Sequence, residues 1–313
     1  MHAAHLVAVS DVHLTATTPV SRCEQDWPGV VLQALSQAVT LANEYGVPLV
    51  IAGDVFDRWF TPNEVVNRTI ATLEQARYGV FGVPGQHDLP GHNYTEIKRT
   101  AYWTLCAAGV LHNLEPNTPA TLPNKVRLWG VPWGHPIPAI QLSKNFVDVA
   151  VVHAYIHTRE TGHVGASETK LVAGYAEDLR GFRAAVFGDN HKGFIATTHW
   201  GTSVLNSGVL VRRASDEQGK LPGFGVLRVT PEGVAYWERV YTDREAEWHT
   251  QAAELAVPQL SGHAVQAVLA SMQTGNTALD FEQGLRTAME TQGTRLEVRR
   301  YVSTALEQAV RGG

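Results

Sequence analysis

Short polar signals follow a series of apolar runs in this chain, and their order constrains the fold more than any other feature. The first three signals are Asp11-Val-His13, Gly53-Asp54-Val-Phe-Asp57 and Gly85-Gln86-His87-Asp88. His153 ends the apolar run at residues 149–152, and Asp189-Asn-His191 follows the run at residues 185–188. Each signal lies just past the end of a predicted strand, where open α/β sheets place their ligand sites. The pattern therefore predicts a site assembled from several strand ends.

The first third of the chain alternates strands and helices. Strands are predicted at residues 6–9, 49–52 and 80–83, and helices at about 28–44, from Thr61-Pro62 onward and at about 95–108. This alternation predicts a mainly parallel sheet covered by helices. Further short strands, separated by Gly, Pro and Asn turns, are predicted at residues 126–131, 147–152, 184–187, 193–198, 202–205, 224–229 and 234–239. They favour a second, mixed or antiparallel sheet packed on the first, in a four-layer α/β/β/α sandwich.

After residue 243 the strand pattern stops and apolar residues recur at helical spacing. Three such faces carry Val265, Val268, Leu269 and Met272, then Phe281, Leu285 and Ala288, then Val298, Val302, Ala305, Leu306 and Ala309. Gly275-Asn276 and Gly293 separate the three predicted helices. We therefore expect a catalytic domain at residues 1–242 and a small helical C-terminal region at residues 243–313.

Composition excludes several classes of protein. The chain has 313 residues and a formal net charge of −5, so no general excess of basic residues is available for gripping nucleic acid. Cys23 and Cys106 are the only cysteines, which is too few for a disulfide framework and is typical of a reducing compartment. No apolar stretch is long enough to cross a membrane, and the start of the chain has no basic flank or cleavage site. We expect a cytoplasmic protein without membrane association.

Carboxylates and imidazoles at these strand ends are typical of a centre that holds two metal ions. Asp11 and His13 are alternate residues of an extended segment, as are Asp189 and His191, so the members of each pair face the same way. Asp54 follows the second strand, and its two carboxylate oxygens suit it to bridge two ions.

The ordered motifs resemble those of the calcineurin-like metallophosphoesterases over roughly residues 5–242. Gly53-Asp54-Val-Phe-Asp57 and Asn206-Ser207-Gly208 are similar in particular to the SbcD-type DNA-repair nuclease branch. The resemblance implies the fold given above, with Asp11, His13 and His191 holding a first ion, Asp54 bridging and His153 holding a second ion. It also implies that His87 protonates the leaving oxygen, that Asp88 orients His87, and that Asp57 is structural.

Two residues depart from the family pattern, and both belong to the second ion. Gln86 stands where the family has Asn, and Asp189 where it has His. The second ion would meet Asp54, Gln86, His153 and Asp189, a hard and anionic set that favours Mn²⁺, or Mg²⁺ or Fe²⁺, over Zn²⁺. These motif variants resemble those of phage-type relatives, so we interpret them as a subfamily variant. The alternative interpretation is a second ion that is weakened or lost.

The resemblance implies a metal-dependent phosphodiesterase that cuts DNA as an exonuclease or endonuclease in repair. In this family the nuclease works with an SbcC-like SMC ATPase, and a homodimer is also left open. A second hypothesis keeps the chemistry but replaces DNA by a small-molecule, nucleotide or phosphoprotein ester, which the net charge of −5 favours modestly. A third hypothesis is a non-catalytic scaffold with a degenerate second metal site.

Overall fold

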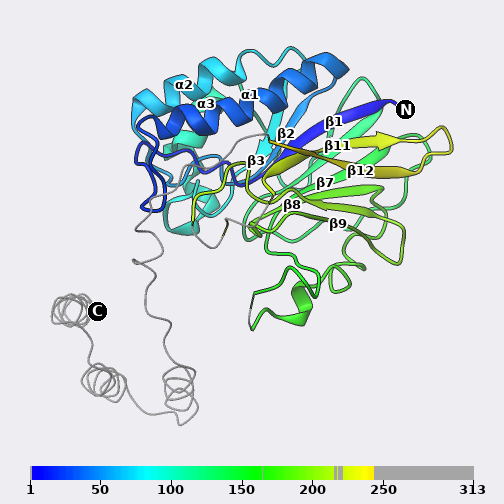
Figure 1. Cartoon of the computed structure of the whole chain (residues 1–313). Helices are drawn as coiled ribbons and strands as arrows, with labels where there is room; N and C mark the ends of the chain where they lie inside the picture. Colours follow the sequence, from blue (N-terminus) through cyan, green and yellow to red (C-terminus); the bar gives the residue numbers. More distant parts are fainter. Residues whose placement is uncertain (1, 164, 215–216, 218–220, 243–313) are drawn as a thin grey trace, which may run out of the picture. The chain divides into compact units, whose positions relative to one another are not determined.

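A computed structural model describes residues 2–163, 165–214, 217 and 221–242. The predicted helices of residues 243–313 lie outside the described residues. Figure 1 shows two sheets, one of them covered by helices. The first sheet has the order β12-β11-β1-β2-β3-β4, and the second has the order β5-β6-β7-β8-β10-β9. Both are six-stranded, so the predicted sandwich of two sheets is confirmed.

In the first sheet, β1, β2, β3 and β4 are neighbours in that order and run parallel, with β4 at one edge. Strands β11 and β12 extend the sheet beyond β1 by antiparallel pairing. Its strands are β1 (Ala4–Val9), β2 (Leu49–Ala52), β3 (Val80–Val83), β4 (His112–Asn113), β11 (Gly223–Val229) and β12 (Ala235–Tyr241). The sequence pattern led us to expect the last two strands in the second sheet, and this was wrong. Strand β11 instead pairs antiparallel with β1 in the first sheet.

The second sheet is mixed, as predicted. Its strands are β5 (Ala120–Thr121), β6 (Val126–Val131), β7 (Val147–His153), β8 (Ala184–Gly188), β9 (Phe194–Thr197) and β10 (Ser203–Asn206). Strands β6, β7, β8 and β10 run parallel to one another, and β5 and β9 pair antiparallel at the two edges.

Both sheets are buried on both faces, which explains the uninterrupted apolar runs of their strands. In β1, Val7 and Val9 face the helices, whereas Leu6 and Ala8 face the second sheet. Strand β8 alternates in the same way between the interior of the sandwich and the outer face of the second sheet. Alternation with a period of two therefore divides each run between two cores.

Helices α1 (Trp27–Tyr45), α2 (Asn63–Leu73) and α3 (Ala101–Ala107) cover the first sheet (Figure 1). The Asp26 side chain caps α1 by accepting from the amide of Gly29, and Gly46 ends it at a φ of 68°. The single helix predicted at about 95–108 is divided into a 3₁₀ helix, η2 (Tyr94–Arg99), and α3. The division lies at Thr100, whose extended backbone lets its hydroxyl cap α3.

The outer face of the second sheet is covered by residues 154–163 and 165–183 rather than by long helices. These described residues form turns and the short 3₁₀ helix η3 (Glu168–Lys170). They still close a core, because Ile156, Leu179 and Phe182 are buried against the sheet. Within the described residues, no helix is long and apolar enough to cross a membrane.

Candidate metal centre

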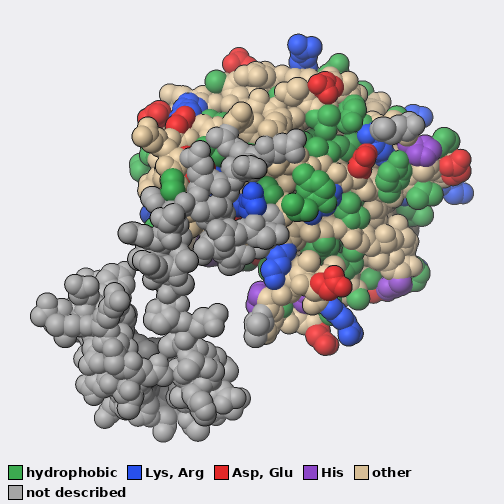
Figure 2. All heavy atoms as spheres, in the orientation of Figure 1, with side chains coloured by type: hydrophobic (Ala, Val, Ile, Leu, Met, Phe, Trp, Pro, Cys, Tyr) green, Lys and Arg blue, Asp and Glu red, His purple; other side chains and the backbone are tan. Residues whose placement is uncertain are grey.

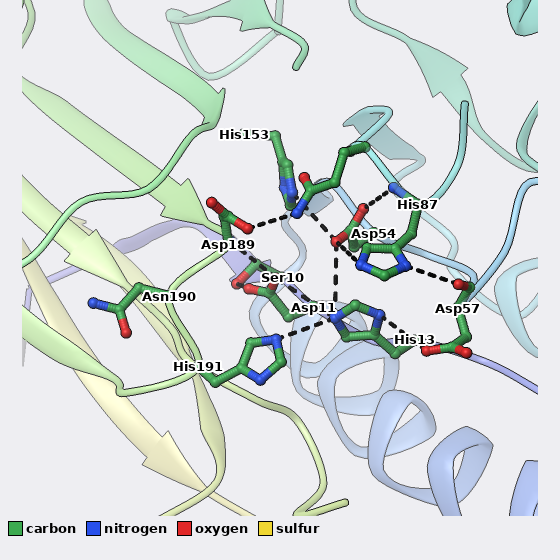
Figure 3. A network of polar contacts seen from close by, with 12 residues as sticks. Ser10, Asp11, His13, Asp54, Asp57, His87, His153, Asp189, Asn190 and His191 are labelled. Atoms are coloured by element: carbon green, nitrogen blue, oxygen red, sulfur yellow. Dashed lines mark hydrogen bonds and ion pairs between the residues drawn. The ribbon is translucent and has the colours of Figure 1, made fainter. Parts of the chain in front are cut away.

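Loops that follow five parallel strands bring polar side chains together at one edge of the sandwich (Figure 3). Asp11 and His13 follow β1, Asp54 follows β2, and Gln86 and His87 follow β3. From the second sheet, His153 ends β7, and Asp189 and His191 follow β8. The carboxyl ends of parallel strands therefore meet where the sequence pattern predicts them.

Four of these residues have positive φ angles, a backbone conformation that residues other than glycine rarely adopt. The φ angles are 50° at Asp11, 49° at His13, 50° at Asp54 and 80° at Asp189. Such conformations cost of order 1–3 kcal/mol each and persist where the surroundings hold them. Here the amide of His13 donates to the carbonyl of Asp54 at 2.9 Å, and the amide of Asp189 donates to Oδ1 of Asp11 at 2.9 Å. These strained turns direct the side chains of the four residues toward the same centre.

Asp11, His13 and His191 form one group of converging ligand atoms. Nε2 of His13 lies 3.3 Å from Nε2 of His191 and 3.9 Å from Oδ1 of Asp11. Oδ2 of Asp54 is 3.8 Å from Nε2 of His13. These are the residues predicted for a first ion together with the predicted bridge.

Asp11, Asp54 and His153 form a second group, in which Nε2 of His153 lies 3.4 Å from Oδ2 of Asp54. Gln86 reaches the same side of the centre, and its Nε2 donates to Oδ1 of Asp189 at 2.6 Å. The two residues that depart from the family pattern therefore contact each other. This bond turns the amide so that Oε1 of Gln86 is buried without a hydrogen bond.

The hydrogen bonds of three histidines fix which nitrogen faces the centre. Nδ1 of His153 lies 2.7 Å from the carbonyl oxygen of Ala52, and Nδ1 of His191 lies 2.9 Å from Oε1 of Glu217. Nδ1 of His87 lies 2.9 Å from the carbonyl oxygen of Asp57. These oxygens only accept hydrogen bonds, so each neutral ring carries its proton on Nδ1 and offers a lone pair at Nε2.

Buried polar atoms without hydrogen bonds gather at this centre. They are His13 Nδ1, Asp54 Oδ2, Gln86 Oε1 and His153 Nε2. Buried polar atoms normally find a partner, and carboxylate, amide and imidazole lone pairs are donors that divalent metal ions take up. The residues present therefore fit divalent cations.

Burial and the neighbouring charges act differently on the ionisable groups of the centre. Burial raises the pKa of Asp11 and lowers the pKa of His13 well below its usual value. At His153, burial works against the charged ring, yet the Asp54 carboxylate raises the pKa to about 10. The position between His153 and Asp54 thus attracts a positive charge, which a proton or a metal cation can supply.

Three glycines make room for the centre. A Cβ atom on Gly53 would lie 2.0 Å from Nδ1 of His153, and one on Gly85 would lie 2.1 Å from Oδ1 of Asp54. A Cβ atom on Gly188 would lie 2.6 Å from Nδ1 of His153. Close approach therefore requires glycine at all three positions, and at Gly53 a φ of 83° requires it as well.

Asp88 does not have the role that the resemblance implies. Both of its oxygens accept backbone hydrogen bonds, from Val55 at 3.1 Å, Phe56 at 2.9 Å and Gly85 at 3.0 Å. Burial and the nearby Asp54 raise its pKa to about 7. Asp88 thus ties the β2 and β3 loops together, whereas the carbonyl of Asp57 orients His87.

His87 and Asp57 lie at the open side of the centre. The His87 side chain is 43% exposed, and its Nε2 is 4.0 Å from Oδ2 of Asp54. Oδ1 of Asp57 is 3.6 Å from Nδ1 of His13 and accepts from Nη1 of Arg213 at 2.5 Å. Asp57, expected to be structural, thus also forms a group of potential ligands with His13 and His87.

Further residues support the centre, in roles that the sequence did not assign. The Ser10 hydroxyl donates to Oδ2 of Asp11 at 2.5 Å and lies 2.7 Å from the hydroxyl of Ser207. Asn206 donates to the carbonyl of Asn190 at 2.6 Å, so the Asn206-Ser207-Gly208 motif supports the loop that carries His191. Glu217 and Arg213 follow no strand end, and no local pattern marks them.

Comparisons with known proteins give structural matches only. No protein-family model matches the chain, and no curated protein matches it. A dimetal phosphatase from Danio rerio matches with a TM-score of 0.50 and 11% identity, over 77% of this chain and 99% of that chain. The protein TT1561 of Thermus thermophilus matches with a TM-score of 0.46 and 15% identity, over 76% of this chain and 99% of that chain.

Vps29 from Entamoeba histolytica, solved with zinc, matches with a TM-score of 0.33 and 15% identity, over 75% of this chain and 98% of that chain. The Danio rerio match and the arrangement of the two sheets agree on architecture. The described part of this chain shares its fold with the Danio rerio dimetal phosphatase.

Proposed function

We propose that this protein is a phosphoric-ester hydrolase that uses two divalent cations to cleave phosphodiesters, and that its substrate is DNA. One observation supports the proposal most directly. Nε2 of His13 and Nε2 of His153, from the two sheets, lie 3.8 Å and 3.4 Å from Oδ2 of Asp54, and His153 Nε2, Asp54 Oδ2 and Gln86 Oε1 are buried without hydrogen bonds. Buried polar atoms without hydrogen bonds lower the stability of the fold unless a ligand binds them. Divalent cations would accept the lone pairs of these atoms.

The side chains divide between two cations around Asp54. Asp11, His13 and His191 would hold the first, and Asp54 would contact both. His153 and the free Oε1 of Gln86 would hold the second together with Asp189, whose Oδ1 accepts from the Gln86 amide. Two divalent cations neutralise charge that develops on the phosphoryl oxygens and provide a nucleophilic water near neutral pH.

His87 is suited to protonate the departing oxygen. Its Nδ1 proton is held by the carbonyl of Asp57, so Nε2 is the nitrogen that can hold and deliver a second proton. The ring lies at the exposed side of the centre, where a substituent of the phosphate can leave. His87 therefore acts as a general acid, while the buried histidines hold cations.

The second cation site suits a hard ion. Gln86 keeps the carbonyl oxygen of the family's Asn, and Asp189 replaces a neutral nitrogen by an anionic oxygen. We propose Mn²⁺ as the native metal, ahead of Mg²⁺ or Fe²⁺, with Zn²⁺ disfavoured. Gln86 and Asp189 contact each other, which supports the interpretation that the two departures from the family pattern belong together, as in a phage-type variant.

A groove beside the centre supports a substrate with a large substituent on phosphorus. It has a volume of about 710 Å³, and Asp57 and Arg213 line it next to His13 and His87. Phe60 on its rim is 73% exposed. An exposed aromatic ring beside a phosphate site can stack a nucleobase, which favours a nucleoside-containing diester.

Binding of DNA would depend on this local groove rather than on a general basic surface. In Figure 2, the part of the surface that is not grey carries Lys and Arg side chains interspersed with Asp and Glu. This mixture agrees with the net charge of −5. We further propose an SbcD-like role in DNA repair in the cytoplasm, with an SbcC-like ATPase as partner or with a second copy of the chain.

The test compares three substrates with Mn²⁺ and with chelator: a labelled DNA strand or duplex, bis(p-nitrophenyl) phosphate, and the monoester p-nitrophenyl phosphate. We expect Mn²⁺-dependent cleavage of DNA and of the small diester, and loss of both in Asp54→Asn. If the protein cleaves the small esters but not DNA, the proposed substrate becomes a small molecule instead of DNA. A folded protein that binds cations but cleaves none of the three substrates would contradict the proposal that it is a hydrolase.

A further inference from the structure

Glu217 is a buried carboxylate that no strand-end motif includes, yet it contacts a residue of the centre. Its residue surface is 2% exposed. Oε1 lies 2.9 Å from Nδ1 of His191, and Oε2 accepts from the amides of Arg213 at 2.6 Å and Ala214 at 3.2 Å. The carboxylate is therefore fixed by the backbone on one side and holds an imidazole on the other.

His191 needs such support more than the other inward-facing histidines. Its side chain is 30% exposed, against 1% for His13 and 0% for His153. It also lies in a loop, whereas His153 is the last residue of β7. Packing alone thus leaves the His191 ring freer to turn, and the bond to Glu217 limits this rotation.

The contact also determines what His191 offers to the centre. A carboxylate only accepts, so Nδ1 of His191 keeps its proton and Nε2 presents a lone pair 3.3 Å from Nε2 of His13. His153 and His87 are held by the neutral carbonyls of Ala52 and Asp57. An anionic acceptor makes the ring a stronger donor to a cation than a neutral carbonyl does.

We propose that Glu217 is a positioning residue that orients His191 and sets the affinity of the first cation. This inference rests on the proposed function only in that the centre binds cations; it does not depend on which ester is cleaved. Glu217 contacts Nδ1 of His191, so a cation bound at Nε2 would lie on the other side of the ring from the carboxylate. Its contribution reaches the centre through the orientation and basicity of that ring.

The test measures Mn²⁺ binding to the full chain by isothermal titration calorimetry. Partners behind metal-ligating histidines typically contribute about 10–100-fold to metal affinity. We expect Glu217→Ala to weaken one of two bound Mn²⁺ ions by about this factor. Glu217→Gln should lose less, because the amide oxygen still accepts from Nδ1. The matched control is Glu177→Gln, which alters a surface pair with His199 in which the two side chains are 68% and 60% exposed.

A second measurement separates positioning from a general loss of structure. Histidine ¹⁵N NMR on the metal-free chain should show the Nδ1-protonated form of His191 in the wild type and in Glu217→Gln, and a mixture of ring forms in Glu217→Ala. Folded Glu217→Ala with wild-type Mn²⁺ affinity and an unchanged His191 spectrum would overturn the role of Glu217. Two bound Mn²⁺ ions without ester cleavage would instead overturn the proposed function alone.

Discussion

His87 differs from the other histidines of the centre because it is 43% exposed and its Nδ1 is held by a backbone carbonyl. Substitution by Ala should leave Mn²⁺ binding close to that of the wild type, since the buried groups of potential ligands centred on Asp11 do not include it. Turnover should fall by about 10²–10⁴-fold, which is the usual contribution of a general acid. Steady-state kinetics on a phosphodiester, paired with calorimetry, check both parts. Full turnover in this variant would remove His87 from the reaction.

Gly85 illustrates how little space surrounds the predicted bridging carboxylate. A Cβ atom at this position would lie 2.1 Å from Oδ1 of Asp54 and 2.6 Å from Nε2 of His153. Gly85→Ala should therefore displace Asp54 and abolish binding of at least one cation while the chain stays folded. Gly91→Ala is the control, because its Cβ meets nothing within 4 Å although its φ of 54° is strained. Equal cation binding by both variants would show that Asp54 can move without loss.

Strands and helices were predicted most accurately where local pattern determines them. The apolar runs at residues 49–52 and 80–83 are strands with those bounds, because their alternate residues are buried on two faces. The assignment of β11 to a sheet was wrong, since pairing with β1 depends on contacts far apart in the sequence. Strand-end motifs likewise predicted the side chains that converge on Asp54, whereas Glu217 contacts His191 through tertiary structure that no spacing encodes.

Arg127 and Asp148 tie two neighbouring strands of the second sheet. They are paired in register on β6 and β7, and the guanidinium makes two 2.7 Å bonds to the carboxylate. Asp148 is fully buried, whereas the Arg127 side chain is 25% exposed. Arg127→Leu leaves a buried carboxylate with only the Trp129 indole, so it should reduce the free energy of unfolding by about 3 kcal/mol.

The control for this prediction is Arg99→Leu, which breaks an exposed pair with Glu96 and should cost less than about 1 kcal/mol. Asp148→Leu should cost less than Arg127→Leu, because the freed guanidinium can turn into solvent. Urea denaturation gives all three free energies. If Arg127→Leu and Arg99→Leu were equally stable, the pair would contribute nothing to the sheet.

The cation centre joins the two sheets, because its potential ligands follow β1 and β2 in one sheet and β7 and β8 in the other. A cation that binds only the folded chain stabilises it by mass action, by about 2.7 kcal/mol when its concentration is about 100 times the Kd. Mn²⁺ should therefore raise the midpoint of thermal unfolding, and chelator should reverse the change. Mn²⁺ should also slow amide hydrogen exchange, and the slowing should be largest in β2 and β7, which lie in different sheets.

Asp54→Asn separates binding at this centre from weak binding elsewhere on a chain with a net charge of −5. The amide keeps the size of the carboxylate but removes the anionic oxygen that lies 3.4 Å from His153 and 3.8 Å from His13. This variant should unfold at nearly the same temperature with Mn²⁺ as with chelator, because the neutral oxygen attracts a cation far less. An Asp54→Asn protein stabilised as much as the wild type would mean that Mn²⁺ acts at another site, and that the two sheets are not joined through Asp54.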